Sequence, residues 1–218
     1  MISKQDVLDA FYFRHACKTF DPARRIPEED FNFILETGRL SPSSFGYEPW
    51  QFLVIQDMGL RERLLEHAWG AKGQFPTASH VVAILVRGED MRPGSVYPER
   101  FMRKVQKLTD EAISRRTKFY KQFHESDFEL QDARVLFEWG CRQAYIPLAN
   151  MMTVAAMLGI DSCPIEGFNR REAERVLNEA GLLEDGRLGL AVFVAFGYRV
   201  NPQLEKKRRA MEEVVKWV

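Results

Sequence analysis

The order of hydrophobic and polar positions predicts two helices within the first forty residues. Ser3 and Asp6 stand at the spacing of a helix-capping box, with Asp in place of the usual Glu or Gln, and apolar residues follow at helical spacing. This first helix is expected to end close to Arg14. A second helix is predicted to begin at Pro27, a favourable first-turn residue followed by three acids, and to end before the SPSS sequence at 41–44.

Four further segments have helical patterns. Residues 60–69 and the capped segment 169–180 predict short helices, and 98–131 is mostly helical with the polarity of a peripheral or lid-like region. Residues 132–158 predict one long helix whose second half is apolar nearly all round, a pattern typical of burial on every side. Since one chain of this size offers limited cover for such a helix, a partner subunit is expected.

Three apolar runs predict strands: FLVI at 52–55, SHVVAILVRG at 79–88 and LGLAVFVAFGYR at 188–199. The last two are continuously apolar rather than alternating, as expected of a sheet that is covered on both faces. The chain has 218 residues, 45% of them hydrophobic, which is enough for one substantial core. We therefore expect a single domain over 1–218 that mixes helices and strands.

Charge and cysteine content narrow the function classes. Lys+Arg and Asp+Glu number 31 each, so a broad attraction to nucleic acid or to an anionic membrane has no support. The three cysteines and four histidines lack disulfide or metal-ligand spacing, which indicates reduced thiols, a cytoplasmic protein and no metal site. The N-terminus lacks the apolar core of a secretory signal, and the apolar run 144–160 falls short of a membrane span.

Two basic clusters are the first candidate for chemistry. Arg14, His15 and Lys18 stand between aromatic residues near the start, and a KKRR sequence follows at 206–209. Arg and Lys side chains that converge from separate segments suit a phosphate group, whereas two solvated charge runs are the alternative. Neither GxGxxG after a strand nor GxxxxGK[ST] is present, so side chains must hold any phosphate; GxSxG is also missing, which leaves a hydrolytic triad unsupported.

Two loops are the second candidate. SPSSFGYEPWQF at 41–52 offers hydroxyls and backbone groups to a planar polar ligand, although an ordinary helix-to-strand connection with a core Trp has the same composition. PIEGF at 164–168 predicts a buried turn in which Gly167 permits close approach of the backbone to a ligand.

The order of six motifs resembles the FMN-dependent nitroreductase family along nearly the whole chain. The motifs are RHACKTF, SPSSFGYEPWQF, ASHVVAILV, GIDSCPIEGF, VAFGYR and KKRRAMEEVV. The similarity is greatest to oxygen-insensitive NAD(P)H nitroreductases and dihydropteridine reductase-like members. It implies an α+β nitroreductase fold, with a central, mostly antiparallel sheet flanked by helices, in an intertwined homodimer. It also implies a variable helical excursion at about 90–138 and a tail at about 199–218 that reaches the partner subunit.

The resemblance implies a set of FMN-binding residues in this chain. Arg14, Lys206 and Arg208 match positions that hold the FMN phosphate, His15 matches a residue against the ribityl chain or phosphate, and Lys18 matches one near the pyrimidine edge. The full set is Arg14, His15, Ala16, Lys18, Pro42, Ser43, Ser44, Gln74, Pro164, Ile165, Glu166, Gly167, Lys206 and Arg208.

Two further groups come from loops, and two positions depart from the family pattern. Residues 42–44 match a loop that reaches FMN across the dimer interface, and residues 164–167 match a turn whose backbone amide faces flavin N5.

Ala16 stands where the family usually has Ser, so one hydroxyl contact to the phosphate is missing. Gln74 stands where close relatives have Lys, and an amide stabilises a negatively charged reduced ring less than an ammonium does.

The function implied is an FMN-dependent oxidoreductase that takes hydride from NADH or NADPH and reduces nitroaromatics, quinones or similar organic acceptors by a ping-pong course. The flavin carries the redox chemistry, so no side chain is assigned as catalytic. The alternatives are another flavin enzyme on the same fold, such as a dehalogenase or an enone reductase, and a noncatalytic polyanion-binding module. Acceptor choice is expected to depend on the excursion around Phe123 and His124.

Overall fold

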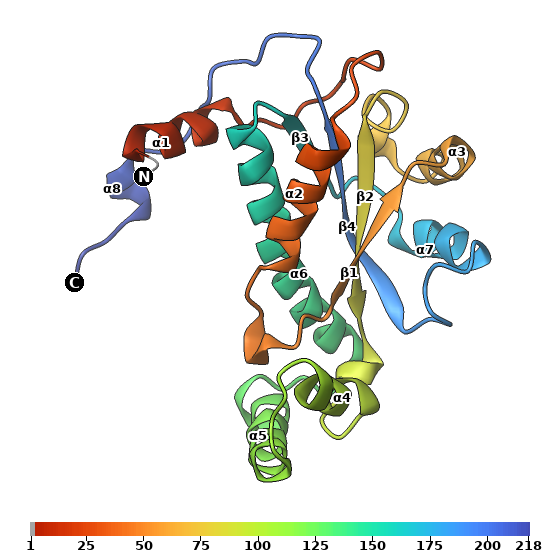
Figure 1. Cartoon of the computed structure of the whole chain (residues 1–218), viewed down its shortest axis with the longest axis vertical. Coiled ribbons are helices and arrows are strands. Elements are labelled where there is room, and N and C mark those ends of the chain that lie inside the picture. Colours follow the sequence, from red (N-terminus) through yellow and green to blue (C-terminus); the bar gives the residue numbers. More distant parts are fainter. Residues whose placement is uncertain (1–2) are drawn as a thin grey trace.

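The computed structural model, which describes residues 3–218, is an α+β structure built on a four-stranded antiparallel sheet (Figure 1). The strand order is β1-β2-β4-β3, and every adjacent pair is antiparallel. The strands are β1 (Trp50–Ile55), β2 (His80–Arg87), β3 (Asp161–Ile165) and β4 (Leu188–Gly197). This arrangement confirms the predicted fold class.

The helices lie close to their predicted positions. They are α1 (Lys4–Phe13), α2 (Glu28–Arg39), α3 (Met58–Leu65), α4 (Val96–Lys104), α5 (Asp110–Gln122), α6 (Ala133–Met157), α7 (Arg170–Glu179) and α8 (Met211–Val214). The capping box at α1 is confirmed, because Asp6 N donates to Ser3 Oγ at 3.1 Å and Ser3 N donates back to Asp6. Asp132 caps α6, and the excursion is divided into α4, α5 and a π-helical turn at Phe123–Asp127. Within residues 3–218, no helix has the length and apolarity that crossing a membrane requires.

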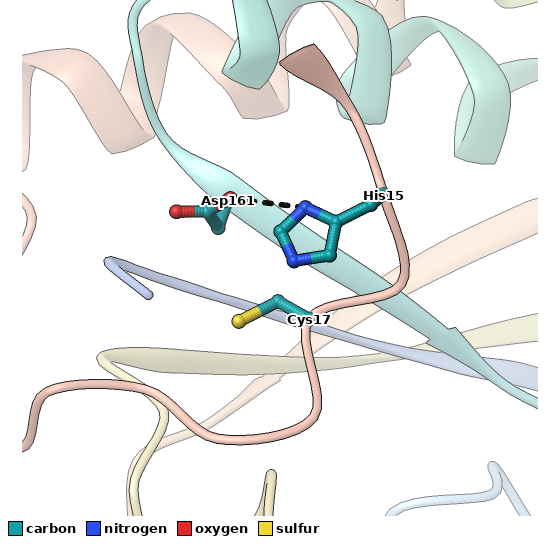
Figure 2. Close-up of side chains that lie close together, drawn as sticks. All are labelled: His15, Cys17 and Asp161. Atoms are coloured by element: carbon teal, nitrogen blue, oxygen red, sulfur yellow. Dashed lines mark ion pairs between the residues drawn. The ribbon is translucent and has the colours of Figure 1, made fainter. Parts of the chain in front are cut away.

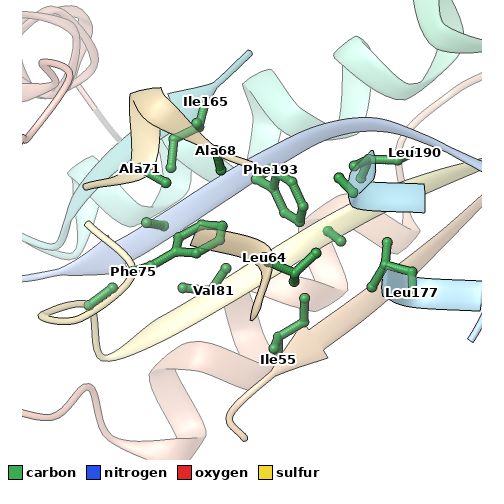
Figure 3. Close-up of a cluster of buried hydrophobic side chains, with 14 of the residues drawn as sticks. Ile55, Leu64, Ala68, Ala71, Phe75, Val81, Ile165, Leu177, Leu190 and Phe193 are labelled. Carbon is green, nitrogen blue, oxygen red and sulfur yellow. The ribbon is translucent and has the colours of Figure 1, made fainter. Parts of the chain in front are cut away.

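Both faces of the sheet are buried, as the continuously apolar strands predicted. Successive residues of β2 belong alternately to two cores, so that Val81 faces one and Val82 the other. The first core lies between the sheet and the pair α3 and α7, and Figure 3 shows Leu64 and Leu177 from these helices beside sheet residues. The second core lies beneath α2 and α6, which pack together over the opposite face (Figure 1).

The strand β3 was missed by the sequence reading, which placed Pro164 and Ile165 in a turn. The structure corrects this: both residues belong to β3, and the turn begins at Glu166. The segment DSCPI begins with two polar residues and contains a proline, so it lacks the apolar run by which the other strands were recognised. Its place at the sheet edge explains why the proline is tolerated, since β3 pairs along its length with β4 and the isolated bridge on its other side is at Ser162, not at Pro164.

The two ends of the described chain run side by side. The segment after α1 forms a parallel bridge from Ala16 to Ser162 of β3, and Phe20 forms an antiparallel bridge to Arg199, just after β4. From there the tail turns back along α1 and ends at α8, away from the sheet (Figure 1). The excursion of α4 and α5 lies at the other end of α6 (Figure 1).

Candidate functional site

The two basic clusters meet at one cleft, as their composition predicted. Residues 14–19 and 201–208 line a cavity of about 880 Å³. Five of the described lining residues are Lys or Arg, whereas the one carboxylate among them belongs to Glu205; the cations are Arg14, Lys18, Lys206, Lys207 and Arg208. These cations concentrate positive charge on one concave surface of a chain whose net charge is zero.

Arg199 holds the tail against the N-terminal segment. Its guanidinium lies 2.7 Å from the carboxylate of Asp161 and donates to the Gln203 side chain at 2.8 Å and to the Phe13 carbonyl at 3.2 Å. Gln203 in turn donates to the Tyr12 carbonyl at 2.9 Å. One side chain therefore links β3, the end of α1 and the tail, and so holds together the two segments that line the cleft.

Lys206 has two roles in this cleft. Its ammonium donates to the carbonyls of Phe11, at 2.5 Å, and Arg14, where the end of α1 leaves carbonyls without helical partners. Burial lowers the pKa of Lys206, and the neighbouring cations Arg14 and Arg208 lower it further. These cations repel one another in the absence of an anion, and a phosphate with several acceptor oxygens would relieve that repulsion.

His15 and Cys17, which line the cleft, form a polar cluster with the buried carboxylate of Asp161 (Figure 2). Their ligand atoms lie within 4.8 Å of one another, and His15 Nδ1 is 3.5 Å from Asp161 Oδ1. Burial lowers the pKa of His15, an effect that Arg199 strengthens and Asp161 opposes, so the neutral form of the imidazole is favoured. Burial raises the pKa of Cys17 to about 11. The thiol therefore keeps its proton at neutral pH, and the Asp161 carboxylate already pairs with Arg199.

Lys18 and Gln74 converge on Cys163 in β3. The Lys18 ammonium lies 3.9 Å from Cys163 Sγ, and Gln74 Nε2 lies 3.4 Å from the same sulfur. Gln74 is buried, and the neighbouring Gly73 packs so closely on Lys18 that an added Cβ would lie 2.3 Å from the Lys18 carbonyl oxygen. Two nitrogen donors, one charged and one neutral, are thus placed together beside the cleft.

The turn after β3 packs against a second glycine. Gly70 N donates to the Gly167 carbonyl at 2.7 Å, and a Cβ added at Gly167 would lie 2.9 Å from Gly70 Cα. This contact requires glycine on both sides. Within residues 3–218 the Gly167 N–H has no hydrogen-bond acceptor, so this donor remains available. Glu166 accepts a hydrogen bond from the Tyr145 hydroxyl of α6, and burial together with that carboxylate raises the pKa of Tyr145.

Pro42, Ser43 and Ser44 do not join this cluster within one chain. They belong to the connection between α2 and β1, at the end of α6 that lies beside α5 (Figure 1). Ser44 N donates to Gln143 of α6 at 2.9 Å, and Ser43 Oγ accepts from Glu48 N at 2.9 Å. Six of the remaining predicted site residues line the cleft: Arg14, His15, Ala16, Lys18, Lys206 and Arg208. Gln74 lies beside Lys18 at Cys163, and residues 164–167 follow Cys163 along the chain.

Sequence reasoning missed the two residues that hold the cleft together. Asp161 and Arg199 are separated by 38 positions, and no local motif connects them. The available signals were that Asp161 is an acid at the start of a buried segment and that Arg199 is a cation at the end of a predicted apolar strand. Cys17 and Cys163 were taken as reduced thiols without a role, although each is adjacent in sequence to predicted site residues. The fold adds that Cys17 lies close to His15 and Asp161, and that Cys163 lies close to Lys18 and Gln74.

Comparison with known proteins agrees with this geometry. The family model described as "Nitroreductase family" matches residues 12–198. A Bacillus subtilis (strain 168) protein named "Putative NAD(P)H nitroreductase YfkO" is 48% identical over 217 residues, which cover 99% of this chain and 98% of that protein.

Two solved structures share the fold. One, from Exiguobacterium sibiricum 255-15, is described as "a putative nitroreductase in complex with FMN"; it has a TM-score of 0.75 at 20% identity, covering 100% of this chain and 98% of that one. The other is the enone reductase CLA-ER of gut-bacterial fatty acid saturation, with a TM-score of 0.77 at 17% identity and full coverage of both chains.

Proposed function

Because the chain belongs to the nitroreductase family, and is therefore an oxidoreductase, we propose that it is an FMN-dependent NAD(P)H oxidoreductase that reduces nitroaromatic, quinone or similar organic acceptors. The observation that carries this proposal is the basic cleft between residues 14–19 and 201–208, which adjoins Lys18, Gln74 and the end of β3. The FMN complex of a protein with the same fold adds support.

The cleft residues fit the phosphate of FMN. Arg14 and Arg208 offer guanidinium groups from separate segments, and one N–H of Lys206 remains after its two bonds to carbonyls. His15 presents a neutral imidazole beside them. Ala16 has no hydroxyl to add, so phosphate binding rests on the cations.

Other residues fit the flavin ring. When bound, FMN supplies the hydride chemistry, and the protein contributes binding, orientation and electrostatics. Lys18 places positive charge beside the site, which stabilises negative charge on a reduced ring, while Gln74 offers a neutral amide donor. Gly167 offers a free backbone N–H from a turn held rigid by Gly70.

We propose that the active form is a homodimer in which Pro42, Ser43 and Ser44 of one subunit complete the site of the other. Large apolar side chains are exposed on α1, α2, α6 and the tail: Leu8, Phe11, Tyr12, Phe33, Tyr145, Ile146, Met211, Val214, Val215 and Trp217. Trp217 is 94% exposed on a tail that leaves the sheet. A second copy would cover this surface and bring the two parts of the site together.

A second candidate is another flavin-dependent reduction on the same fold, such as that of an enone. It is favoured by the fold shared with an enone reductase, because one fold hosts several reductions. Both candidates require bound FMN and differ in the acceptor. The two are separated by turnover with nitroaromatics and quinones on one side and activated alkenes on the other.

The decisive experiment is the visible absorption spectrum of the purified protein, with added FMN if needed, before and after anaerobic NADH or NADPH. We expect flavin bands that bleach with a nicotinamide donor and return when an acceptor is added. Bands that persist with either donor would contradict the nicotinamide-dependent reductase and favour another flavin enzyme. The absence of bands after reconstitution would contradict FMN binding altogether.

A further inference from the structure

The connection between α2 and β1 is held by side chains of the excursion. Arg116 of α5 donates to the Phe45 carbonyl at 2.5 Å. Gln106, between α4 and α5, donates to the carbonyls of Phe45 at 3.1 Å and Gly46 at 3.0 Å. Both side chains reach 60 or more positions back along the chain, so these bonds are formed by the tertiary fold.

The next two carbonyls are held in the same way. The Tyr97 hydroxyl of α4 lies 3.2 Å from the Tyr47 carbonyl and 3.0 Å from the Glu48 carbonyl. Four successive carbonyls, at 45–48, therefore lie within hydrogen-bond distance of donors from three side chains of the excursion. Glu48 N donates to Ser43 Oγ, and this bond links residues 45–48 to the predicted cofactor-binding residues 42–44.

The backbone of this connection adopts a conformation that needs such support. Phe45 has φ 57° and ψ 0°, and Glu48 has φ 46°, so two residues that carry Cβ atoms lie in the left-handed region. Gly46 between them has φ 64°. Left-handed backbone is costly for a bulky residue such as Phe and persists where surrounding contacts fix it.

Aromatic packing fixes the side chain of Phe45 as well. Its ring lies 4.9 Å from Tyr120 and 5.2 Å from Phe123, measured between ring centroids, in edge-on arrangements. Phe123 is thus part of the support for this connection, alongside any role beside the acceptor. On the opposite side, Gln143 of α6 accepts from Ser44 N.

We infer that Tyr97, Gln106 and Arg116 are positioning residues that hold the connection carrying Pro42, Ser43 and Ser44 in the geometry needed to complete the partner subunit's cofactor site. The inference rests on the proposed function. The polarity of the excursion suggests a peripheral lid. We infer instead that it acts as a clamp: its side chains hold residues 45–48 and thereby fix the position of residues 42–44. Changes in the excursion would then alter cofactor affinity in addition to acceptor choice.

The first test compares Arg116→Ala with Arg115→Ala, the same substitution at the neighbouring position of α5. Arg115 is exposed and, within residues 3–218, donates no hydrogen bond to the connection. We expect Arg116→Ala to speed amide hydrogen exchange of residues 43–48 at least about tenfold and to weaken FMN binding by about tenfold, with Arg115→Ala within about twofold of the parent. Equal exchange and equal FMN affinity in the two variants would overturn the inference.

The second test removes the amide donors of Gln106 with substitutions that leave the residues of α5 unchanged. Gln106→Met and Gln106→Glu keep the size of the side chain but lose the amide donors, and Gln106→Glu also sets a carboxylate against two carbonyl oxygens. We expect Gln106→Glu to weaken FMN binding more than Gln106→Met, and Arg116→Lys to restore part of what Arg116→Ala loses. Parent-like affinity in both Gln106 variants would count against the clamp.

The inference and the proposed function fail in different ways. If the parent does not take up FMN, the proposed function is wrong, and hydrogen exchange of 43–48 alone then decides whether Arg116 holds the connection. If the parent binds FMN and Arg116→Ala frees the connection without loss of affinity, the function stands and the positioning role is wrong.

Discussion

Arg199, directly beyond β4, forms an ion pair with Asp161, the first residue of β3, at 2.7 Å. The carboxylate is almost fully buried, and it also accepts from the backbone N–H of Arg199 at 2.9 Å. The pair fixes the direction in which the chain leaves the sheet. The tail consequently returns across α1. This return places residues 201–208 beside residues 14–19, and the cleft lies between the two segments.

Asp161→Asn is expected to destabilise the fold and loosen the tail. The substitution keeps the shape of the side chain but leaves Arg199 without its charge partner, so we expect the free energy of unfolding to fall by about 2–4 kcal/mol. Urea unfolding and limited proteolysis of residues 199–218 measure the two effects. Asp185→Asn, at an exposed position in left-handed backbone that Asn tolerates, is the control. Equal stability of the two variants would mean that the pair is dispensable.

Arg208→Ala is expected to weaken FMN binding by about tenfold while the unfolding free energy of the apoprotein changes by less than about 0.5 kcal/mol. The reason is that Arg208 is exposed and, within the described residues, bonds only to the carbonyl of Lys207. Fluorescence titration with FMN and with riboflavin, which lacks the phosphate, checks this. Riboflavin affinity should not change, and Arg209→Ala, next to the cleft lining, should behave as the parent does. An unchanged FMN affinity would remove Arg208 from the phosphate site.

Lys18→Met is expected to lower the reduction potential of the bound flavin by on the order of 30 mV, the equivalent of a tenfold change in a two-electron equilibrium. The ammonium near Cys163 contributes positive charge that favours the reduced ring, and Met removes that charge at similar length. Equilibration with a reference dye measures the potential, with Lys104→Met on α4 as the control. A holo variant with the parent's potential would place Lys18 away from the ring.

His124 is expected to make stability depend on pH. Burial lowers its pKa from 6.5 to about 4, so the native state resists a proton that the unfolded chain accepts. Stability is therefore present above pH 6.5 and falls as the pH drops from 6.5 towards 4, by about 3 kcal/mol for this residue. His124→Phe, which keeps a ring between Tyr120 and Trp139, should flatten that fall in urea unfolding. His80, with a pKa lowered to about 4, should continue to contribute in the variant, whereas an identical slope for parent and variant would contradict the assignment.

The elements that could be predicted are those whose signals are local. The predicted capping residues Ser3 and Asn169 each precede a helix in the structure, because a cap depends on a few adjacent backbone groups. The continuous apolar runs at β2 and β4 identified strands buried on both faces for the same reason: every side chain in such a strand meets a core.

What could not be predicted depends on distant partners. The strand β3 is short and begins with two buried polar residues, so its composition does not predict a strand. Its pairing with β4 is what stabilises it as one. The hydrogen bonds from Gln106 and Arg116 end on backbone carbonyls, which are present at every residue and leave no mark in a sequence. The excursion therefore has the composition of a solvated lid, although it packs on the loop it holds.

The cleft also imposes an order of events on synthesis of the chain. Arg14 and Lys206, which meet at its base, are 192 positions apart. Residues 14–19, which line one side of the cleft, are synthesised early. Residues 201–208, which line the other side, follow all four strands in the chain. A nascent chain that stops before Lys206 has every strand yet cannot close the anion site. If the protein binds FMN as proposed, cofactor capture would wait until translation has passed the tail, and we expect a product truncated before Lys206 to be colourless.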